Sequence, residues 1–303
     1  MNLRFVEAFY WAVTLKSVTR AAEKLFITQS ALSSRIAALE EELGVLLLDR
    51  RDKQFRLTIA GTRFHRHAER LLSLQSEIRA ELGGPGVQRS AALRLGVIES
   101  VLHSWLVDWV QGFRQHHVQL QLDLTVETTP VLLDQLRRGT LDLIVAALPV
   151  DGEGMGSRAL APMPMVLVGP RAGVRPRRQS LARLAQTQEL LTFQRGSQPH
   201  VALLEQCRSE GVESPRVHNI SSISAMVELV AQGFGLATLP EATVARLSAQ
   251  RPLALIRTEA PLRPLPIHLS WREDPGAPIV GQAVAAILAQ PHVLPSSKKS
   301  MKA

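Results

Sequence analysis

The stretch that decides the fold runs from residue 17 to residue 44 and reads SVTRAAEKLFITQSALSSRIAALEEELG. Ser17 and Thr28 each precede a helical pattern, and their hydroxyls suit N-caps because they can accept a hydrogen bond from a first-turn amide. After Thr28, apolar residues recur at helical spacing and predict one buried face: Leu32, Ile36, Leu39 and Leu43. The stretch therefore predicts two helices joined by a short turn, which is a helix-turn-helix.

The opposite face of the second helix carries short, uncharged side chains and begins at the helix N-terminus. Glutamine can bond adenine in two places, serine can meet several bases, and small residues let the helix approach base edges in a major groove. The alternative is an ordinary solvated face, but such faces usually carry Lys and Glu. We therefore expect a recognition helix for double-stranded DNA. Its expected DNA contacts are Thr28, Gln29, Ser30, Ser33, Ser34 and Arg35.

A basic hairpin is expected directly after the helix-turn-helix. Residues 46–48 and 55–57 read as two short strands joined by the polar residues 50–54, which makes a wing. Six basic residues and one acid fall between residues 50 and 66. Lys and Arg bind phosphates without choosing a base sequence, so we expect Arg50, Arg51 and Lys53 to lie along the DNA backbone.

The order of residues resembles one protein family. The pattern AA-x2-L-x2-TQSALS-x2-I-x2-LE-x2-LG-x2-LL-x-R occupies residues 21–50, and LT-x-AG follows at residues 57–61. This order is similar to that of the LysR-type bacterial transcriptional regulators, with Leu48 standing where the family usually has Phe. The resemblance implies promoter DNA with an interrupted palindrome as the binding site, RNA polymerase as a further partner, and a small-molecule effector.

Length and composition agree with a multidomain protein and permit a polyanionic partner. The chain has 303 residues, 46% of them hydrophobic, and a formal net charge of +8. No stretch approaches the 18 apolar residues of a membrane span, and the first residues lack the apolar core of a signal peptide. A single cysteine, Cys207, excludes an intramolecular disulfide. We expect a cytoplasmic protein without a membrane partner.

A long helix is expected over residues 59–83, after the winged helix-turn-helix of residues 1–58. Apolar residues form a stripe along this helix that a single small domain cannot cover, so it implies a partner helix from a second subunit. The family resemblance also implies a linker helix that pairs subunits, in a dimer or tetramer. The expected dimerisation residues are Phe64, Leu71, Leu74 and Ile78. A Gly- and Pro-containing hinge over residues 84–91 follows.

From residue 92 onward, short apolar strands alternate with helical patterns, which predicts an α/β domain with mainly parallel sheets. The expected strands are 93–97, 120–126, 141–147, 165–168, 190–193, 217–219, 236–239 and 264–271. Breaks near 161–164 and 264 predict two lobes, with lobe I over 92–162 and 266–293 and lobe II over 163–265. The LysR resemblance implies the same two-lobed fold, similar to periplasmic solute-binding proteins, although His117 replaces a common Pro. A basic tail, 294–303, ends the chain.

Four polar clusters follow predicted strands, where a cleft between the lobes would gather them. Hydroxyls and free amides at helix N-termini favour anions, although any one Ser or Thr is more often a simple N-cap. Arg195 suits a carboxylate, whereas Glu99 suits an amine or hydroxyl. We therefore expect a small, anionic effector. Its expected contacts are Ser100, Thr128, Thr129, Ala147, Arg195, Ser197 and Ser222.

No catalytic, metal-binding or cofactor motif is found in the sequence. Cys207 lies in a helical pattern, and His65 and His67 are two residues apart on a helix, so their side chains diverge. Three alternatives stay open: an effector-independent, architectural DNA-binding protein, a single-thiol redox sensor on the same scaffold, and an enzyme with an appended DNA-binding domain. The large two-lobed domain argues against the first, and the missing catalytic residues argue against the third.

Overall fold

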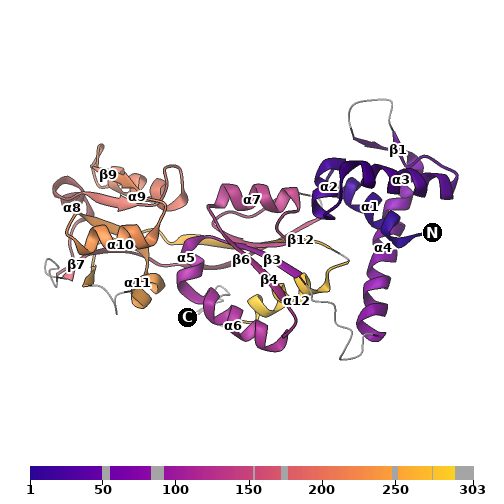
Figure 1. The fold of residues 1–303 in the computed structure, drawn as a ribbon. Helices are drawn as coiled ribbons and strands as arrows, with labels where there is room; N and C mark the ends of the chain where they lie inside the picture. The colour runs from indigo at the N-terminus through magenta and orange to yellow at the C-terminus, as the bar shows by residue number, and fades with distance from the viewer. Residues whose placement is uncertain are drawn as a thin grey trace, which may run out of the picture.

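The computed structural model describes residues 1–49, 55–82, 92–152, 154–171, 177–247, 252–274 and 276–290. The expected wing contacts Arg50, Arg51 and Lys53, the expected hinge 84–91 and the basic tail 294–303 lie outside these residues. Figure 1 shows an elongated molecule in which lobe I lies between the N-terminal domain and lobe II.

The N-terminal domain is a winged helix-turn-helix followed by a long helix. Its elements are α1 (Leu3–Thr14), α2 (Val18–Lys24), α3 (Gln29–Leu43), β1 (Leu48–Asp49), β2 (Arg56–Leu57) and α4 (Ile59–Leu82). The predicted N-caps are confirmed, because the Ser17 hydroxyl accepts from the Arg20 amide and the Thr28 hydroxyl from the Ala31 amide. The wing strands are shorter than predicted. A buried carboxylate, that of Glu40, holds the start of β1 by accepting from two backbone amides.

Lobe I is built on a five-stranded sheet of order β4-β3-β5-β12-β6. Its strands are β3 (Ala92–Val97), β4 (Gln121–Val126), β5 (Leu143–Ala146), β6 (Met155–Met163) and β12 (Leu265–Arg272). Its helices are α5 (Glu99–Val101), the π-helix η1 (Leu102–Leu106), α6 (Val107–His116), α7 (Thr129–Arg138) and α12 (Pro278–Leu288). Helix α7 covers one face of the sheet, and α6 and α12 cover the other (Figure 1).

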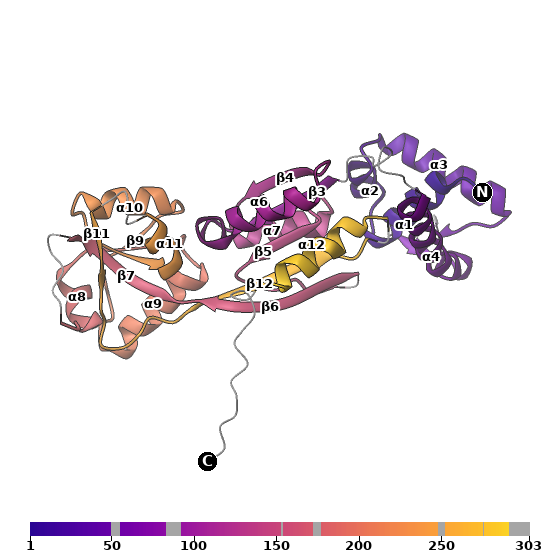
Figure 2. The ribbon, with the colours of Figure 1, turned by 90° about the horizontal axis from the view of Figure 1, so that it is seen from below.

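Lobe II is built on a second five-stranded sheet, of order β11-β7-β10-β8-β9. Its strands are β7 (Met165–Pro170), β8 (Leu190–Thr192), β9 (Val217–Asn219), β10 (Leu236–Pro240) and β11 (Leu253–Ile256). Its helices are α8 (Leu181–Thr187), α9 (Gln198–Ser209), α10 (Ile223–Ala231) and α11 (Glu241–Leu247). Figure 2 shows α8 and α9 on one side of this sheet and α10 and α11 on the other.

The two sheets are mixed, so the prediction of mainly parallel strands was wrong for half of the strand pairs within the lobes. Strand β12 pairs antiparallel with β5 and β6, and β7 pairs antiparallel with β10 and β11. The chain passes from lobe I to lobe II at Pro164, between β6 and β7, and returns between β11 and β12. Strands β7 and β12 are therefore the first strands after each crossing. Strands β6 and β11 were not predicted, because their residues show no clear alternation between buried and exposed positions.

The winged-helix domain rests on lobe I through a buried ion pair. The Nζ atom of Lys24, at the end of α2, donates to Oδ1 of Asp142 at 2.8 Å and lies 3.6 Å from Oδ2 of Asp274. The Lys24 side chain is only 8% exposed, and its ammonium lies 4.7 Å from the centroid of the Trp11 ring. Arg94 donates to the same Asp142 carboxylate from both Nε and Nη2. The two domains therefore share a desolvated charge network.

A glycine at the C-cap of α7 lets the two domains approach. Gly139 has a φ of +77°, which favours glycine, and a Cβ atom there would lie 3.3 Å from Cδ2 of Leu15 in the winged-helix domain. Any side chain at this position would thus strain the backbone and press on Leu15. Gly139 and Asp142, three residues apart, thus form the lobe I side of the contact, and Leu15 and Lys24 form the winged-helix side.

Candidate functional site

The N-terminal half of α3 presents polar side chains to solvent. Leu32, Ile36 and Leu39 are fully buried and fix the rotation of the helix in the domain. The opposite face is exposed at five of the six predicted positions, Thr28, Gln29, Ser30, Ser33 and Ser34, while Arg35 is half-buried. This face has the size and the hydrogen-bonding groups that a major groove accepts.

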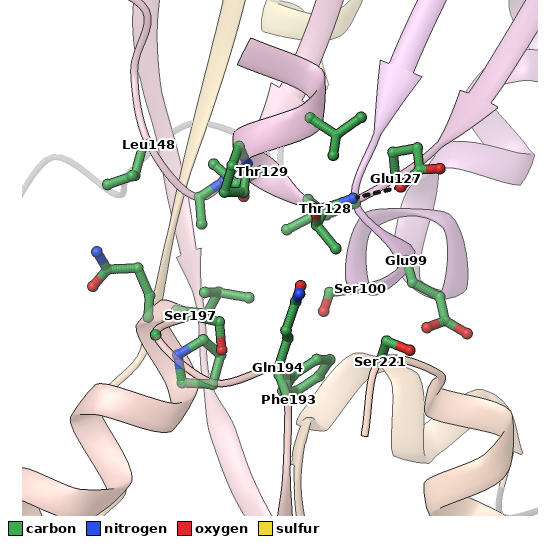
Figure 3. A pocket seen from close by; sticks show the side chains of 18 of the residues that line it. Glu99, Ser100, Glu127, Thr128, Thr129, Leu148, Phe193, Gln194, Ser197 and Ser221 are labelled. Atoms are coloured by element: carbon green, nitrogen blue, oxygen red, sulfur yellow. Dashed lines mark hydrogen bonds between the residues drawn. The ribbon is translucent and has the colours of Figure 1, made fainter. Parts of the chain in front are cut away.

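A cavity of about 640 Å³ lies between the two lobes. Lobe I contributes the residues that follow β3, β4 and β5, and lobe II contributes the residues that follow β8 and precede α10. The structure brings all of the predicted effector contacts to this one cavity: Ser100, Thr128, Thr129, Ala147, Arg195, Ser197 and Ser222. Figure 3 shows hydroxyls from both lobes directed at the same space.

Helices α7 and α9 begin at the cavity, one from each lobe, and both lack a side-chain cap. Thr128 precedes α7 and Ser197 precedes α9, and neither hydroxyl makes a cap hydrogen bond. The Oγ atom of Ser197 is buried and has no hydrogen-bond partner among the described residues. Thr129 uses its own hydroxyl to accept from the amide of Ala147. Uncapped first-turn amides carry partial positive charge, so both helix starts favour an anion.

A third helix start at the cavity, that of α10, is already capped. The Ser222 hydroxyl accepts from the Ala225 amide at 3.4 Å. The Oε2 atom of Glu99, from lobe I, accepts from the Ile223 amide at 2.9 Å. This hydrogen bond links the two lobes across the cleft.

Among the described residues, three ionisable side chains line the cavity, Glu99, Glu127 and Arg195. Nearby, His200 accepts from the amide of Gly196 through Nδ1 at 3.2 Å. Burial, together with the positive charge of Arg195, lowers the pKa of His200 below its ordinary value. At neutral pH this histidine is therefore uncharged, and Arg195 is the only formal cation among the described residues that line the cavity.

Comparisons with known proteins identify the family. The model described as "Bacterial regulatory helix-turn-helix protein, lysR family" matches residues 3–62, and the model described as "LysR substrate binding domain" matches residues 87–290. The chain belongs to the LysR family of bacterial transcriptional regulators. The family resemblance predicted from residues 21–61 is thus confirmed.

Two relatives and a solved structure match this LysR regulator over about three quarters or more of its length. A probable hydrogen peroxide-inducible genes activator from Streptomyces viridosporus is 31% identical over 226 residues, which cover 74% of this chain and 72% of the relative. One of the same name from Mycobacterium leprae (strain TN) is 28% identical over 290 residues, covering 94% and 92%. A full-length OxyR cysteine-to-aspartate variant from Pseudomonas aeruginosa has a TM-score of 0.62 and 25% identity, covering 99% of this chain and 98% of that chain.

The apolar stripe on α4 divides into a covered and an open part. Phe64 packs edge-on against Phe9 of the same domain, with ring centroids 5.5 Å apart, so the structure places it at the domain core. Leu71 is half-buried, whereas Leu74 is 52% and Ile78 is 46% exposed. The second half of the predicted dimerisation set is therefore the part of the stripe that a single LysR subunit leaves open.

The only cysteine in this LysR regulator is unsuited to redox chemistry. Cys207 lies in α9 and is fully buried. Burial, with a smaller contribution from Glu210, raises the pKa of its thiol to about 11. A thiolate is the reactive form, so this thiol is unreactive at neutral pH.

The described residues contain neither a metal-binding cluster nor a membrane-spanning helix. No cluster of three or more His, Cys, Asp and Glu side chains there could hold a metal ion. No helix in the same part of the chain is long and apolar enough to cross a lipid bilayer.

Sequence reasoning missed several residues of the cavity and all of the domain contact. The missed cavity residues are Ile98, Val126, Glu127, Pro130, Val131, Leu148, Phe193, Gln198, Pro199 and Leu265. Glu127 directly precedes a predicted cluster at Thr128, and that neighbourhood could have revealed it. Nothing in the sequence around Lys24 or Asp274 indicates that these two side chains belong to one ion network.

Proposed function

We propose that this LysR regulator binds double-stranded promoter DNA with α3 and the wing, as a homodimer or tetramer, and that a small anion in the cavity controls it. DNA binding would place its action in the bacterial cytoplasm. The DNA contacts are Thr28, Gln29, Ser30, Ser33, Ser34 and Arg35 on α3 and Arg50, Arg51 and Lys53 on the wing. RNA polymerase is a further proposed partner.

One observation carries the effector proposal. Two helix starts, at Thr128 and Ser197, come from opposite lobes, lack caps and line the same cavity. Buried polar groups are normally hydrogen-bonded, so the unpaired Ser197 hydroxyl marks a place for a ligand atom. A carboxylate there could accept from the hydroxyls and amides and could pair with Arg195. Its contacts would draw the lobes together.

Such a ligand would control DNA binding by favouring one angle between the lobes. It binds both lobes at once only when the cleft is closed, so it shifts the population toward the closed state. Because the winged-helix domain rests on lobe I, closing the cleft moves lobe II relative to the DNA-reading helix. In an assembly of subunits, that movement repositions paired recognition helices.

The names of two relatives suggest a response to hydrogen peroxide, but Cys207 does not support it here. Oxidation by peroxide proceeds through an accessible thiolate, and this thiol is buried with a raised pKa. A small organic anion is therefore the signal that the geometry favours.

Screening organic acids against the full-length protein tests the proposal. A ligand that binds the folded state raises the melting temperature. We expect at least one acid to do so, and we expect it to change the affinity for DNA from the regulator's own genomic neighbourhood. Stabilisation that is unchanged in Ser197→Ala and Arg195→Gln would place the ligand elsewhere and contradict the proposal.

A further inference from the structure

Glu99 occupies a position at the cavity where an anionic ligand would otherwise bind. It comes from lobe I, yet its carboxylate accepts from the first amide of α10 in lobe II. Its side chain is only 22% exposed, and its Oε1 atom lies 3.5 Å from Nε2 of His103. The positive end of α10 is thus already matched by a protein carboxylate, and a ligand anion cannot use it without displacing Glu99.

A second carboxylate lies on the same side of the cavity. Glu127 is exposed, and its Oε2 atom accepts from the Thr128 amide at 3.3 Å. Figure 3 shows Glu99 and Glu127 on one side of the cavity, with Ser197 and Thr129 toward the other. The cavity therefore has an acidic side and a side that carries the unpaired Ser197 hydroxyl.

The charge of the cavity opposes a ligand with two negative ends. The ionisable lining residues in the part of the chain that the structure describes are two glutamates and one arginine, which gives them a formal charge of −1. A dicarboxylate would bring one end to the uncapped start of α9 and the other end toward Glu99 and Glu127, where like charges repel in a partly desolvated space. A ligand with a cation at that end would gain a charge-assisted hydrogen bond.

We infer that Glu99 determines the specificity of the cavity, so that the effector is a carboxylic acid that also carries an ammonium group at its far end. The carboxylate lies at the start of α9, beside Arg195 and the unpaired Ser197 hydroxyl, and the ammonium group faces Glu99. This inference rests on the proposed function, because it concerns the same cavity. It assigns to Glu99 a role beyond linking the lobes.

Three series of straight-chain probes test the inference on the full-length protein. They are alkanoates, ω-aminoalkanoates and alkanedioates of four to six carbons, and their dissociation constants are measured by titration calorimetry. We expect an aminoalkanoate to bind the parent protein at least tenfold more tightly than the matching dioate. In Glu99→Gln this preference should fall at least tenfold, because the amide has no charge.

The variant Glu99→Gln separates specificity from structure. Its amide oxygen can still accept from Ile223, so the link between the lobes is kept. Glu213→Gln is the matched control, since Glu213 is exposed and does not line the cavity. It should leave the preference unchanged, and both variants should melt within a few degrees of the parent.

The outcomes distinguish this inference from the proposed function. If a dioate or plain alkanoate binds as tightly as the aminoalkanoate, or if Glu99→Gln leaves the preference intact, Glu99 does not select the ligand. An acid still binds in that case, and the proposed function stands. If no probe of any series binds, the proposal of an anion in the cavity is contradicted, and the inference falls with it.

Discussion

The ammonium group of Lys24 and the carboxylate of Asp142, 118 residues apart in the sequence, form a hydrogen bond of 2.8 Å that joins the DNA-reading domain to lobe I. Burial alone would raise the pKa of Asp142, but the hydrogen bonds and charges of Arg94 and Lys24 outweigh burial and hold it below its usual value. The ionised carboxylate therefore stabilises the folded chain.

Replacing Lys24 with alanine should weaken the contact between the domains. Asp142 and Asp274 would lose a buried cation, and we expect a loss of about 2 kcal/mol in the free energy of unfolding, since Asp142 keeps Arg94. Urea denaturation measures this loss. Arg20→Ala, an exposed change on the same helix, should cost much less. Equal losses in the two variants would show that the ion pair contributes nothing specific.

Two aspartates of the same network should affect the pH dependence of stability in opposite directions. The pKa of Asp142 is lower in the folded state than its unfolded value of about 3.9. Its stabilisation is therefore present above pH 3.9 or so and is lost as the pH falls through the folded pKa. Burial raises the pKa of Asp274, despite the charge of Lys24, so its contribution is present at low pH and is lost as the pH rises.

Denaturation curves between pH 3 and pH 7 check these signs. In Asp142→Asn, the free energy of unfolding should fall less steeply as the pH is lowered, because the variant has no carboxylate to protonate. In Asp274→Asn, the free energy of unfolding should fall more steeply as the pH is lowered, because the variant lacks the stabilisation that protonation of Asp274 provides at low pH. The same slope in both variants and the parent would contradict the proposed pKa shifts.

The recognition helix is tested by Gln29→Ala and Ser33→Ala. Each contact with a base edge contributes about 1–3 kcal/mol, so we expect roughly a tenfold or greater loss in affinity for the specific site. Affinity for random DNA and the melting temperature should change little, because both side chains are exposed. Gln115→Ala, an exposed glutamine in α6, is the control. If the ratio of specific to random binding were unchanged, these side chains would not be reading bases.

The open part of the α4 stripe predicts the assembly surface. Leu74→Asp or Ile78→Asp would place a charge in an apolar seam between subunits, which costs several kcal/mol. Sedimentation should then show monomers. Val118→Asp, at another exposed apolar residue, should leave the assembly intact. Oligomers that persist in both α4 variants would mean that subunits associate elsewhere.

Two of the serines at the cavity, Ser197 and Ser222, should respond differently to alanine. Ser222 caps α10, so Ser222→Ala should lower the stability of the ligand-free protein by about 1 kcal/mol. The Ser197 hydroxyl makes no hydrogen bond, so Ser197→Ala should cost nothing in the ligand-free protein, although it should weaken anion binding. Thermal melts with and without ligand separate the two effects. A destabilised, ligand-free Ser197→Ala variant would contradict the unpaired state of this hydroxyl.

Local patterns in the sequence predicted much of the fold, and long-range contacts explain most of what they missed. The caps at Ser17 and Thr28 and the buried face of α3 depend on neighbours within a few residues, so they were predictable. The hydroxyl clusters were predictable because strand ends gather at one edge of a parallel sheet. Strands β6 and β11 were missed, because their pairing depends on β12 and β7, which lie far away in the sequence.

The central strands of lobe I join the two regions that function requires. Segment 94–99 follows β3 from the Arg94–Asp142 pair to Glu99, and segment 142–147 follows β5 from Asp142 to Ala147 at the cavity wall. The two strands are hydrogen-bonded to each other, so each provides a continuous connection between the ion network and the cavity wall. A ligand bound at Glu99 or Ala147 would therefore act on strands that begin at the contact with α2. The chain passes between the lobes beside Pro164 and again between β11 and β12, so a change in the angle between the lobes has to be accommodated at these two crossings.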